Sequence, residues 1–232
     1  MQAVILASDP CFDLKPITDH VPKSLIRIGT KKIIEHALTQ LPDRISEIII
    51  TVGNFGDQII GYCGGSYNQR RIVYVKQKKF SGAAEALQAC KEVLANRFLV
   101  VPTDGIFAKK DLDHCLNYDQ CLLAREVKGK TEGERIILDT NGYLKGVISG
   151  IHAKNKSLMS TGLGVLTRAF FNYAPASKEK NCLSLSGTLA LAARHFPIPV
   201  LRSEYYLSIK ELSELKRAEK ILKNGLSKDG SC

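Results

Sequence analysis

The sequence predicts an α/β protein with a mostly parallel sheet flanked by helices and a small antiparallel extension. In the first half of the chain, apolar β-rich runs alternate with segments of helical periodicity. Such alternation implies right-handed crossovers between parallel strands. From about Cys121 the pattern changes to successive short strands, with a hairpin turn expected at 139–142, where Asn-Gly tolerates positive φ.

The first half supplies the parallel strands and the helices between them. Strands are expected where apolar residues run without interruption, at 2–7, 47–52, 71–76 and 98–101. Helices are expected between them, at 33–41, 57–62 and 82–95. In sheets of this kind, ligands bind beyond the carboxyl ends of the strands. The loops that begin at Ser8, Gly53, Gln77 and Pro102 are therefore the candidates for a binding site.

The second half is expected to add mainly antiparallel strands. We predict strands at 121–127, 134–138, 143–149, 160–167 and 198–207, and helices at 183–195 and 209–222. No internal repeat or linker divides the sequence. Residues 1–223 are therefore predicted to form a single domain, and residues 224–232, which are rich in Gly, Ser and Lys, a flexible tail.

Composition narrows the class of protein. The 232 residues, 44% of them hydrophobic, can bury one core without disulfides. No apolar stretch approaches the length of a membrane span, and the N-terminus lacks the pattern of a secretion signal, so we expect no membrane association and a cytoplasmic location. Seven cysteines at irregular spacing, with no C-x-x-C pair, predict reduced thiols and no zinc site.

The net charge of +10 raises the question of nucleic-acid binding. The cations are scattered, however, and no cluster of them is interleaved with aromatic residues. A nucleic-acid partner is therefore unlikely, and a pocket for a small polyanion such as a nucleotide fits the pattern better.

Two charged residues occupy positions suited to phosphate chemistry. Lys23 follows Pro22, whose rigidity fixes where the lysine leaves the backbone. Asp104 follows an apolar strand directly, which puts a carboxylate at the carboxyl end of the sheet, where a divalent cation with oxygen ligands can be held. The alternatives are a solvent-exposed lysine and an aspartate that caps a turn before Gly105.

The order and spacing of these segments resemble the sugar-phosphate nucleotidyltransferases. These enzymes join a nucleoside triphosphate to a sugar 1-phosphate or a similar phosphorylated alcohol and release pyrophosphate. The resemblance covers nearly the whole chain and implies a Rossmann-like sheet of the nucleotide-diphospho-sugar transferase type. It also implies a nucleotide-binding half at 1–118 and a half that binds sugar or another acceptor at 119–223. The resemblance rests on Ala3-Val-Ile-Leu-Ala7, Leu14-Lys-Pro-Ile-Thr18, Pro22-Lys-Ser-Leu25, Ile33-Ile-Glu-His36, Glu47-Ile-Ile-Ile50, Tyr74-Val-Lys-Gln77, Gly82-Ala-Ala-Glu-Ala-Leu87, Phe98-Leu-Val-Val-Pro-Thr-Asp104 and Thr161-Gly-Leu-Gly-Val165.

The resemblance assigns roles to individual residues. It implies that Lys23 is the catalytic cation and that Asp104 holds Mg²⁺. It also implies that Gln77 and Gly82 meet the base, although Gln77 has an equally plausible role as an ordinary polar residue at a strand end. The full set of implied nucleotide-binding residues is Leu6, Ala7, Ser8, Asp13, Gln77, Gly82 and Ala83, and the implied acceptor-binding residues are Gly162 and Lys154.

The signature loop of this chain is degenerate. Asp9, Cys11 and Asp13 stand where the family has two glycines and an arginine. Side chains at the glycine positions restrict positive φ and block close approach of phosphate to the amides, and an aspartate repels phosphate. We therefore expect free triphosphates to bind poorly compared with a nucleotide diphosphate sugar or a nucleoside.

The second half departs from the family pattern as well. Ser208 stands where the family has a second metal-binding aspartate, and Glu204 is a candidate replacement. The family's Glu-Lys-Pro segment, which meets the sugar, is replaced by Ser149-Gly-Ile-His152, which leaves Lys154 as a displaced candidate.

The sequence therefore favours a nucleotidyltransferase that uses Mg²⁺, a nucleotide and a phosphorylated sugar or alcohol. The alternative is a catalytically inactive family member that serves as a nucleotide-binding regulatory or scaffolding subunit. The implied protein partners are further copies of the chain, in a homo-oligomer, or an active paralogous subunit. A third hypothesis, that the chain is a nucleic-acid-binding module, rests on its net charge alone.

Overall fold

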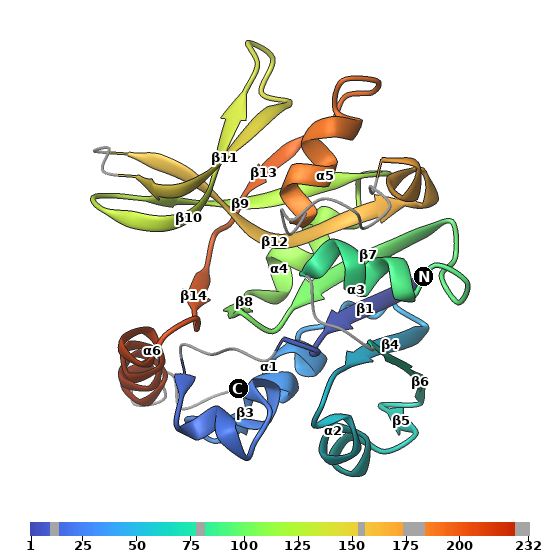
Figure 1. Cartoon of the computed structure of the whole chain (residues 1–232), viewed down its shortest axis with the longest axis vertical. Helices are drawn as coiled ribbons and strands as arrows, with labels where there is room; N and C mark the ends of the chain where they lie inside the picture. The colour runs from blue at the N-terminus through green and yellow to red at the C-terminus, as the bar shows by residue number, and fades with distance from the viewer. Residues whose placement is uncertain (10–13, 78–81, 153–155, 174–183, 226–232) are drawn as a thin grey trace.

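The fold is described here from a computed structural model, which covers residues 1–9, 14–77, 82–152, 156–173 and 184–225 (Figure 1). A ten-stranded mixed sheet forms its centre, with strand order β11-β10-β12-β7-β1-β4-β6-β5 and with β9 and β13 attached beside β12. Its central strands β1 (Gln2–Leu6), β4 (Glu47–Val52), β6 (Arg70–Lys76) and β7 (Arg97–Pro102) pair in parallel. These four strands confirm the parallel core that the sequence predicts.

Helices cover both faces of the sheet because successive strand residues point to opposite sides. Ala3 and Ile5 of β1 belong to one hydrophobic cluster, whereas Val4 and Leu6 belong to another. The first cluster includes residues of α1 (Ile33–Thr39), α2 (Gly56–Cys63) and α4 (Lys109–Cys115). The second includes residues of α3 (Ala83–Ala89) and α5 (Leu185–Ala192). The result is a three-layer α/β/α arrangement.

The antiparallel strands extend the same sheet. β12 (Ser157–Thr167) pairs antiparallel with β7 and with β9 (Cys121–Val127), and β10 (Thr131–Leu138) pairs with β11 (Leu144–His152). The predicted hairpin turn joins β10 to β11. There the carboxylate of Asp139 accepts hydrogen bonds from the amides of Asn141 and Tyr143, and Gly142 has φ 84°.

A third hydrophobic cluster anchors the C-terminal helix. α6 (Leu212–Gly225) contributes Leu215 and Ala218, which pack with Ile28, Ile106 and Ile209. The neighbouring strands are β8 (Gly105–Phe107), which pairs with β14 (Tyr206–Ser208), and β2 (Arg27–Ile28), which pairs with β3 (Lys31–Lys32). The remaining elements are β5 (Ser66–Tyr67), β13 (Val200–Arg202) and the 3₁₀ helices η2 (Ile17–Asp19), η3 (Lys23–Leu25) and η4 (Arg168–Asn172).

The structure corrects the prediction of one strand at 198–207. β13 pairs with β9, β14 pairs with β8 in a separate sheet, and the two strands are divided at 203–205. The carboxylate of Asp111 holds this division in place, because it accepts hydrogen bonds from the hydroxyl of Ser203 and from the amides of Glu204 and Tyr205. Sequence periodicity carries no signal for an aspartate more than 90 residues away.

Helix boundaries also differ from the predictions. The helix predicted at 82–95 ends at Ala89, and α4 was not predicted. The helix predicted at 209–222 begins at Leu212, because the buried Ile209 donates its amide hydrogen bond to the carbonyl of Asp104. It continues to Gly225 and so includes the first two residues of the predicted tail.

Two compositional predictions can be compared with the described residues. None of the helices there combines the length and the apolar character needed to cross a membrane. The described cysteines at 63, 90, 115 and 121 are free thiols, and the last three are buried.

Candidate functional site

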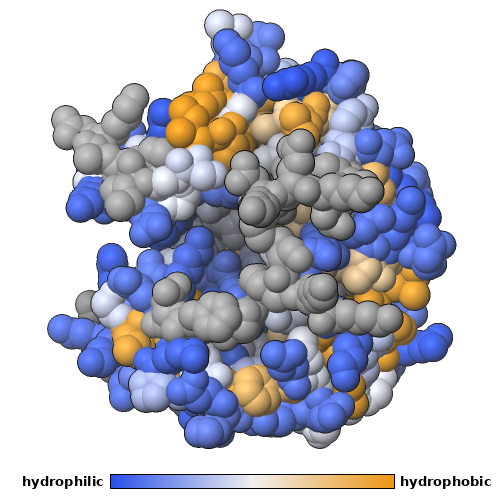
Figure 2. All heavy atoms as spheres, in the orientation of Figure 1, coloured by the Kyte–Doolittle hydropathy of each residue, from blue (hydrophilic) through white to orange (hydrophobic). Residues whose placement is uncertain are grey.

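The predicted loops meet at the carboxyl edge of the parallel strands. Ser8, Gln77 and Thr103 follow the strands β1, β6 and β7, and backbone hydrogen bonds join Gln77 and Thr103 to neighbouring strands. The amide of Thr103 donates to the carbonyl of Leu6, and the amide of Gln77 to that of Val52. Figure 2 shows the surface hollowed between the part of the molecule that carries β10 and the part that carries α6.

Lys23 and Asp104 form an ion pair at this edge. The ammonium Nζ of Lys23 lies 3.0 Å from Oδ1 of Asp104. The Lys23 side chain is only 2% exposed, whereas that of Asp104 is 33% exposed. Burial by itself would raise the pKa of Asp104, but the ammonium groups of Lys23 and Lys210 hold that pKa below its ordinary value of 3.8. The site therefore presents an ionised carboxylate beside a buried cation.

Gln77 has a buried hydrogen-bond donor that has no partner in the described part of the chain. Its side chain is 7% exposed, and its Oε1 accepts a 2.6 Å hydrogen bond from Oγ of Ser8. Among the described residues, no acceptor lies within hydrogen-bond distance of its buried Nε2. A buried polar group without a partner is costly, so this amide is suited to a ligand that offers an acceptor.

The other predicted nucleotide-binding residues that the structure describes lie at the ends of β1 and α3. Leu6 and Ala7 are buried, and the amide of Ala7 donates to Oγ1 of Thr51, which also lies 3.3 Å from Oγ of Ser8. Gly82 has φ 105°, a conformation that favours glycine, and Ala83 begins α3. The structure thus brings Ser8 and Gln77 into direct contact and sets Leu6, Ala7, Gly82 and Ala83 at the ends of their elements.

The acceptor side is described only in part. Gly162 in β12 has φ 74°, and a Cβ added to it would stand 3.4 Å from the ring of Pro102, two residues before Asp104. Gly162 is therefore close to the strand end that carries the carboxylate. Asp13 and Lys154, like Cys11, lie outside the described residues.

Ser208 has a carboxylate beside it that sequence reasoning missed. Its hydroxyl donates a 2.9 Å hydrogen bond to Oε2 of Glu214, which also accepts from the amide of Lys210. Glu204, the replacement that the sequence suggested, is exposed and lies at the division between β13 and β14. No local motif marks Glu214, because its proximity to Ser208 depends on where α6 begins.

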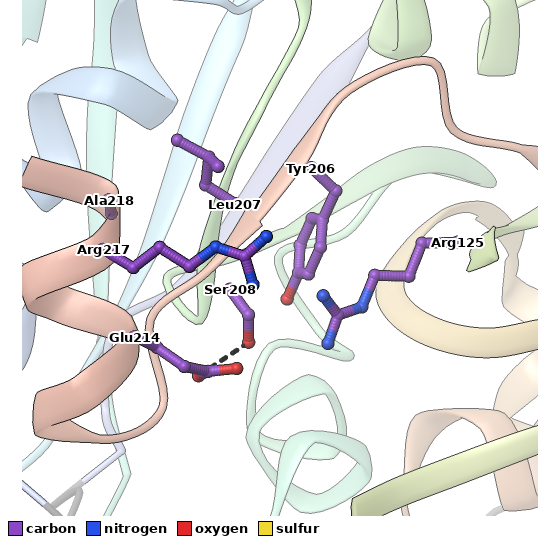
Figure 3. Close-up of a pocket in the computed structure, with 7 residues that line it drawn as sticks. All are labelled: Arg125, Tyr206, Leu207, Ser208, Glu214, Arg217 and Ala218. Carbon is purple, nitrogen blue, oxygen red and sulfur yellow. Dashed lines mark hydrogen bonds between the residues drawn. The ribbon is translucent and has the colours of Figure 1, made fainter. Parts of the chain in front are cut away.

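The same region contains a small pocket (Figure 3). Its volume is about 70 Å³. Two arginines of this pocket come from elements far apart in the sequence, Arg125 from β9 and Arg217 from α6. Sequence analysis did not identify either arginine, since a shared pocket is visible only once the sheet is assembled. The lining residues are Arg125, Tyr206, Leu207, Ser208, Glu214, Arg217 and Ala218.

The residues present fit Mg²⁺ only with help from a ligand. In the described part of the chain, no three His, Cys, Asp or Glu side chains cluster as a metal site. Asp104 offers one carboxylate, of which Oδ1 is bound to Lys23. Proteins often hold Mg²⁺ through one or two carboxylates together with substrate phosphates. Asp104 fits such a site, with phosphate oxygens and water as the other ligands.

Two curated archaeal proteins are similar to the chain over about three quarters of its length. The chain is 25% identical over 178 residues to the bifunctional protein GlmU of Methanocaldococcus jannaschii, covering 77% of this chain and 43% of that protein. It is 28% identical over 182 residues to the UTP–glucose-1-phosphate uridylyltransferase AglF of Haloferax volcanii, covering 74% of each. The chain thus spans less than half the length of the GlmU relative.

Solved structures share the fold. A Bacillus anthracis protein described as a candidate glucose-1-phosphate thymidylyltransferase aligns with a TM-score of 0.85 at 20% identity, covering 97% of this chain and 96% of that chain. A UDP-glucose pyrophosphorylase in complex with UDP-glucose aligns with a TM-score of 0.78 at 15% identity, covering 97% and 98%. A family profile described as "Nucleotidyl transferase" matches residues 2–125. This match covers more than half of the chain and shows that the protein belongs to the sugar-phosphate nucleotidyltransferase family.

Proposed function

We propose that this protein transfers a nucleotidyl group from a nucleoside triphosphate to a phosphorylated sugar or a similar acceptor. The observation that carries the proposal is the pair formed by Lys23 and Asp104, 3.0 Å apart at the carboxyl edge of the sheet. The reaction brings two polyanions together, so catalysis depends mainly on positioning and on neutralising charge. A buried ammonium next to an ionised carboxylate supplies a cation for phosphate and an oxygen ligand for a metal.

Lys23 and Asp104 have different roles in the proposed reaction. A phosphate oxygen of the acceptor attacks the α-phosphorus, the bond from that phosphorus to the bridging oxygen breaks, and pyrophosphate leaves. Lys23 neutralises charge on the phosphates, and Asp104 with phosphate oxygens would hold Mg²⁺. Bound Mg²⁺ would supply additional charge neutralisation.

Gln77 would select the base. Its Nε2 is a donor with no partner among the residues that the structure describes, so it favours a base that presents a carbonyl oxygen. Uracil, thymine, cytosine and guanine present at least one, whereas adenine presents only ring nitrogens as acceptors. The name of the Haloferax volcanii relative specifies UTP and glucose 1-phosphate, which makes this pair the first to test.

The test is pyrophosphate release from each nucleoside triphosphate with a panel of sugar phosphates and Mg²⁺. Lys23→Met should lower the rate by about 100-fold or more, as expected for the loss of a preorganised charge. Lys109→Met is the matched control, because Lys109 also pairs with an aspartate but is 46% exposed. It should retain the parent rate. Absence of pyrophosphate release from every substrate pair would refute the proposal.

One observation favours a second candidate, a nucleotide-binding subunit without catalysis. Ser208 supplies a hydroxyl where the family has a carboxylate, and Oε2 of the nearby Glu214 already accepts two hydrogen bonds. Under this alternative, nucleotide sugars would raise the melting temperature, because a ligand that binds the native state stabilises it. The same samples would release no pyrophosphate, so the two assays together separate the candidates.

A further inference from the structure

The pocket of Figure 3 brings two arginine side chains toward one small volume. Arg125 extends from β9, and Arg217 from the second turn of α6. Its volume of about 70 Å³ accommodates a group of several heavy atoms, since one water needs only about 10 to 15 Å³ on the same measure. Two guanidinium groups at one opening are a common arrangement for recognising phosphate.

The positive charge of the pocket is not neutralised by ion pairs. Neither arginine has a carboxylate oxygen within 4.0 Å among the described residues, whereas Glu126 nearby on β9 pairs with Lys156 and Arg202. Glu214 also lines the pocket, but its Oε2 already accepts hydrogen bonds from Ser208 and Lys210. With one carboxylate against two guanidinium groups, the lining has a net charge of +1.

Tyr206 connects this pocket to the candidate active site. The guanidinium of Arg125 lies 4.8 Å from the centre of its ring, a contact that orients the arginine. The hydroxyl of Tyr206 donates a 3.4 Å hydrogen bond to the backbone carbonyl of Asp104. Ser208, which also lines the pocket, pairs with Gly105, the residue after Asp104. A group in the pocket therefore lies next to the segment that carries the Asp104 carboxylate.

We propose that this pocket binds the phosphate group of the phosphorylated acceptor, with Arg125 and Arg217 as its ligands. The inference rests on the proposed function, which requires an acceptor phosphate close to Asp104. Guanidinium groups donate several hydrogen bonds in a fixed plane and match the oxygens of a phosphomonoester.

Calorimetric titration of the full chain with inorganic phosphate and with glucose 1-phosphate tests the inference, without nucleotide or Mg²⁺. The parent should bind both, and phosphate should compete with glucose 1-phosphate. Arg217→Met should weaken both affinities by about tenfold or more. Lys216→Met removes the same charge from the neighbouring exposed position outside the pocket and should change them less than twofold. Arg125→Met should repeat the loss seen with Arg217→Met.

Three outcomes would overturn the inference. In the first, the parent binds neither ligand. In the second, Arg217→Met and Lys216→Met weaken the two affinities equally. In the third, phosphate binds but does not compete with glucose 1-phosphate. The last result would indicate a separate anion site. Because no triphosphate is present, these titrations do not depend on catalysis. Acceptor binding without pyrophosphate release would refute the proposed reaction while supporting the pocket.

Discussion

The carboxyl edge of the parallel strands and the pocket beside α6 hold their charges in different ways. At the edge, the buried ammonium of Lys23 already has a carboxylate partner 3.0 Å away. In the pocket, Arg217 is exposed, Arg125 is half-buried, and no carboxylate pairs with either arginine among the described residues. A buried charge must be paired in the folded protein, whereas exposed cations can remain available for a ligand. We therefore expect the edge to contribute to stability as well as to the proposed binding, and the pocket mainly to the proposed binding.

The largest expected effect is on folding stability, from removing the charge at the edge. Asp104→Asn should lower the free energy of unfolding by about 2 to 4 kcal/mol, because it takes the carboxylate from an ammonium that is 2% exposed. This range is below that for fully buried pairs, since Asp104 itself is 33% exposed. Urea unfolding at neutral pH measures the loss.

Glu126→Gln is the control for this experiment. Glu126 forms two ion pairs, with Lys156 and Arg202, whose side chains are 61% and 68% exposed. Exposed pairs contribute little, so the variant should lose much less stability than Asp104→Asn. Equal losses in the two variants would show that burial does not distinguish the edge from the rest of the surface.

A smaller effect of the same carboxylate should appear as a pH dependence. The pKa of Asp104 is lower in the folded protein than its ordinary value of 3.8. The stabilisation is then complete above pH 3.8 and is lost as the pH falls through the lower folded value, because the unfolded chain binds the proton first. The stability gap between the parent and Asp104→Asn should therefore narrow in acid. A gap that stays constant from pH 7 to pH 3 would contradict the lowered pKa.

Gln77→Leu should separate binding from stability at the edge. It removes the buried Nε2, which has no partner within the described ranges, and the hydrogen bond from Ser8, two changes with opposite effects on folding. Stability should change by less than about 1 kcal/mol, while nucleoside affinity should fall about tenfold. Gln88→Leu, at an exposed position of α3, should leave nucleoside affinity unchanged. Undiminished affinity in Gln77→Leu would show that this amide does not meet the base.

The same two regions differ in how far the sequence could predict them. Lys23, Asp104 and Gln77 are marked by local signals, namely a preceding proline or the end of an apolar strand, so their elements could be placed from the sequence. Arg125, Arg217 and Glu214 carry no local mark. Their proximity depends on the division of the predicted strand at 203–205 and on the start of α6, and both are fixed by distant partners, Asp111 and the carbonyl of Asp104.

The smallest expected effect comes from restoring, at position 208 beside α6, the carboxylate that the family pattern has there. Ser208→Asp would place a second carboxylate beside that of Glu214, which Ser208 now contacts at 2.9 Å. It would remove that hydrogen bond and add repulsion, so the metal-free variant should lose about 1 kcal/mol of stability.

A ligand that binds the native state raises its stability as the ligand concentration rises. If Asp104 and position 208 can share a cation, Mg²⁺ should therefore restore the stability that Ser208→Asp loses without metal. It should stabilise the parent less. Thermal unfolding with and without Mg²⁺ decides this, with Ser213→Asp on the exposed first turn of α6 as the control for added charge. Equal responses to Mg²⁺ in the parent and both variants would show that position 208 does not face the metal. A carboxylate at position 208 would then be too far from Asp104, or turned away from it, to share a cation, and a single substitution could not restore the second metal ligand.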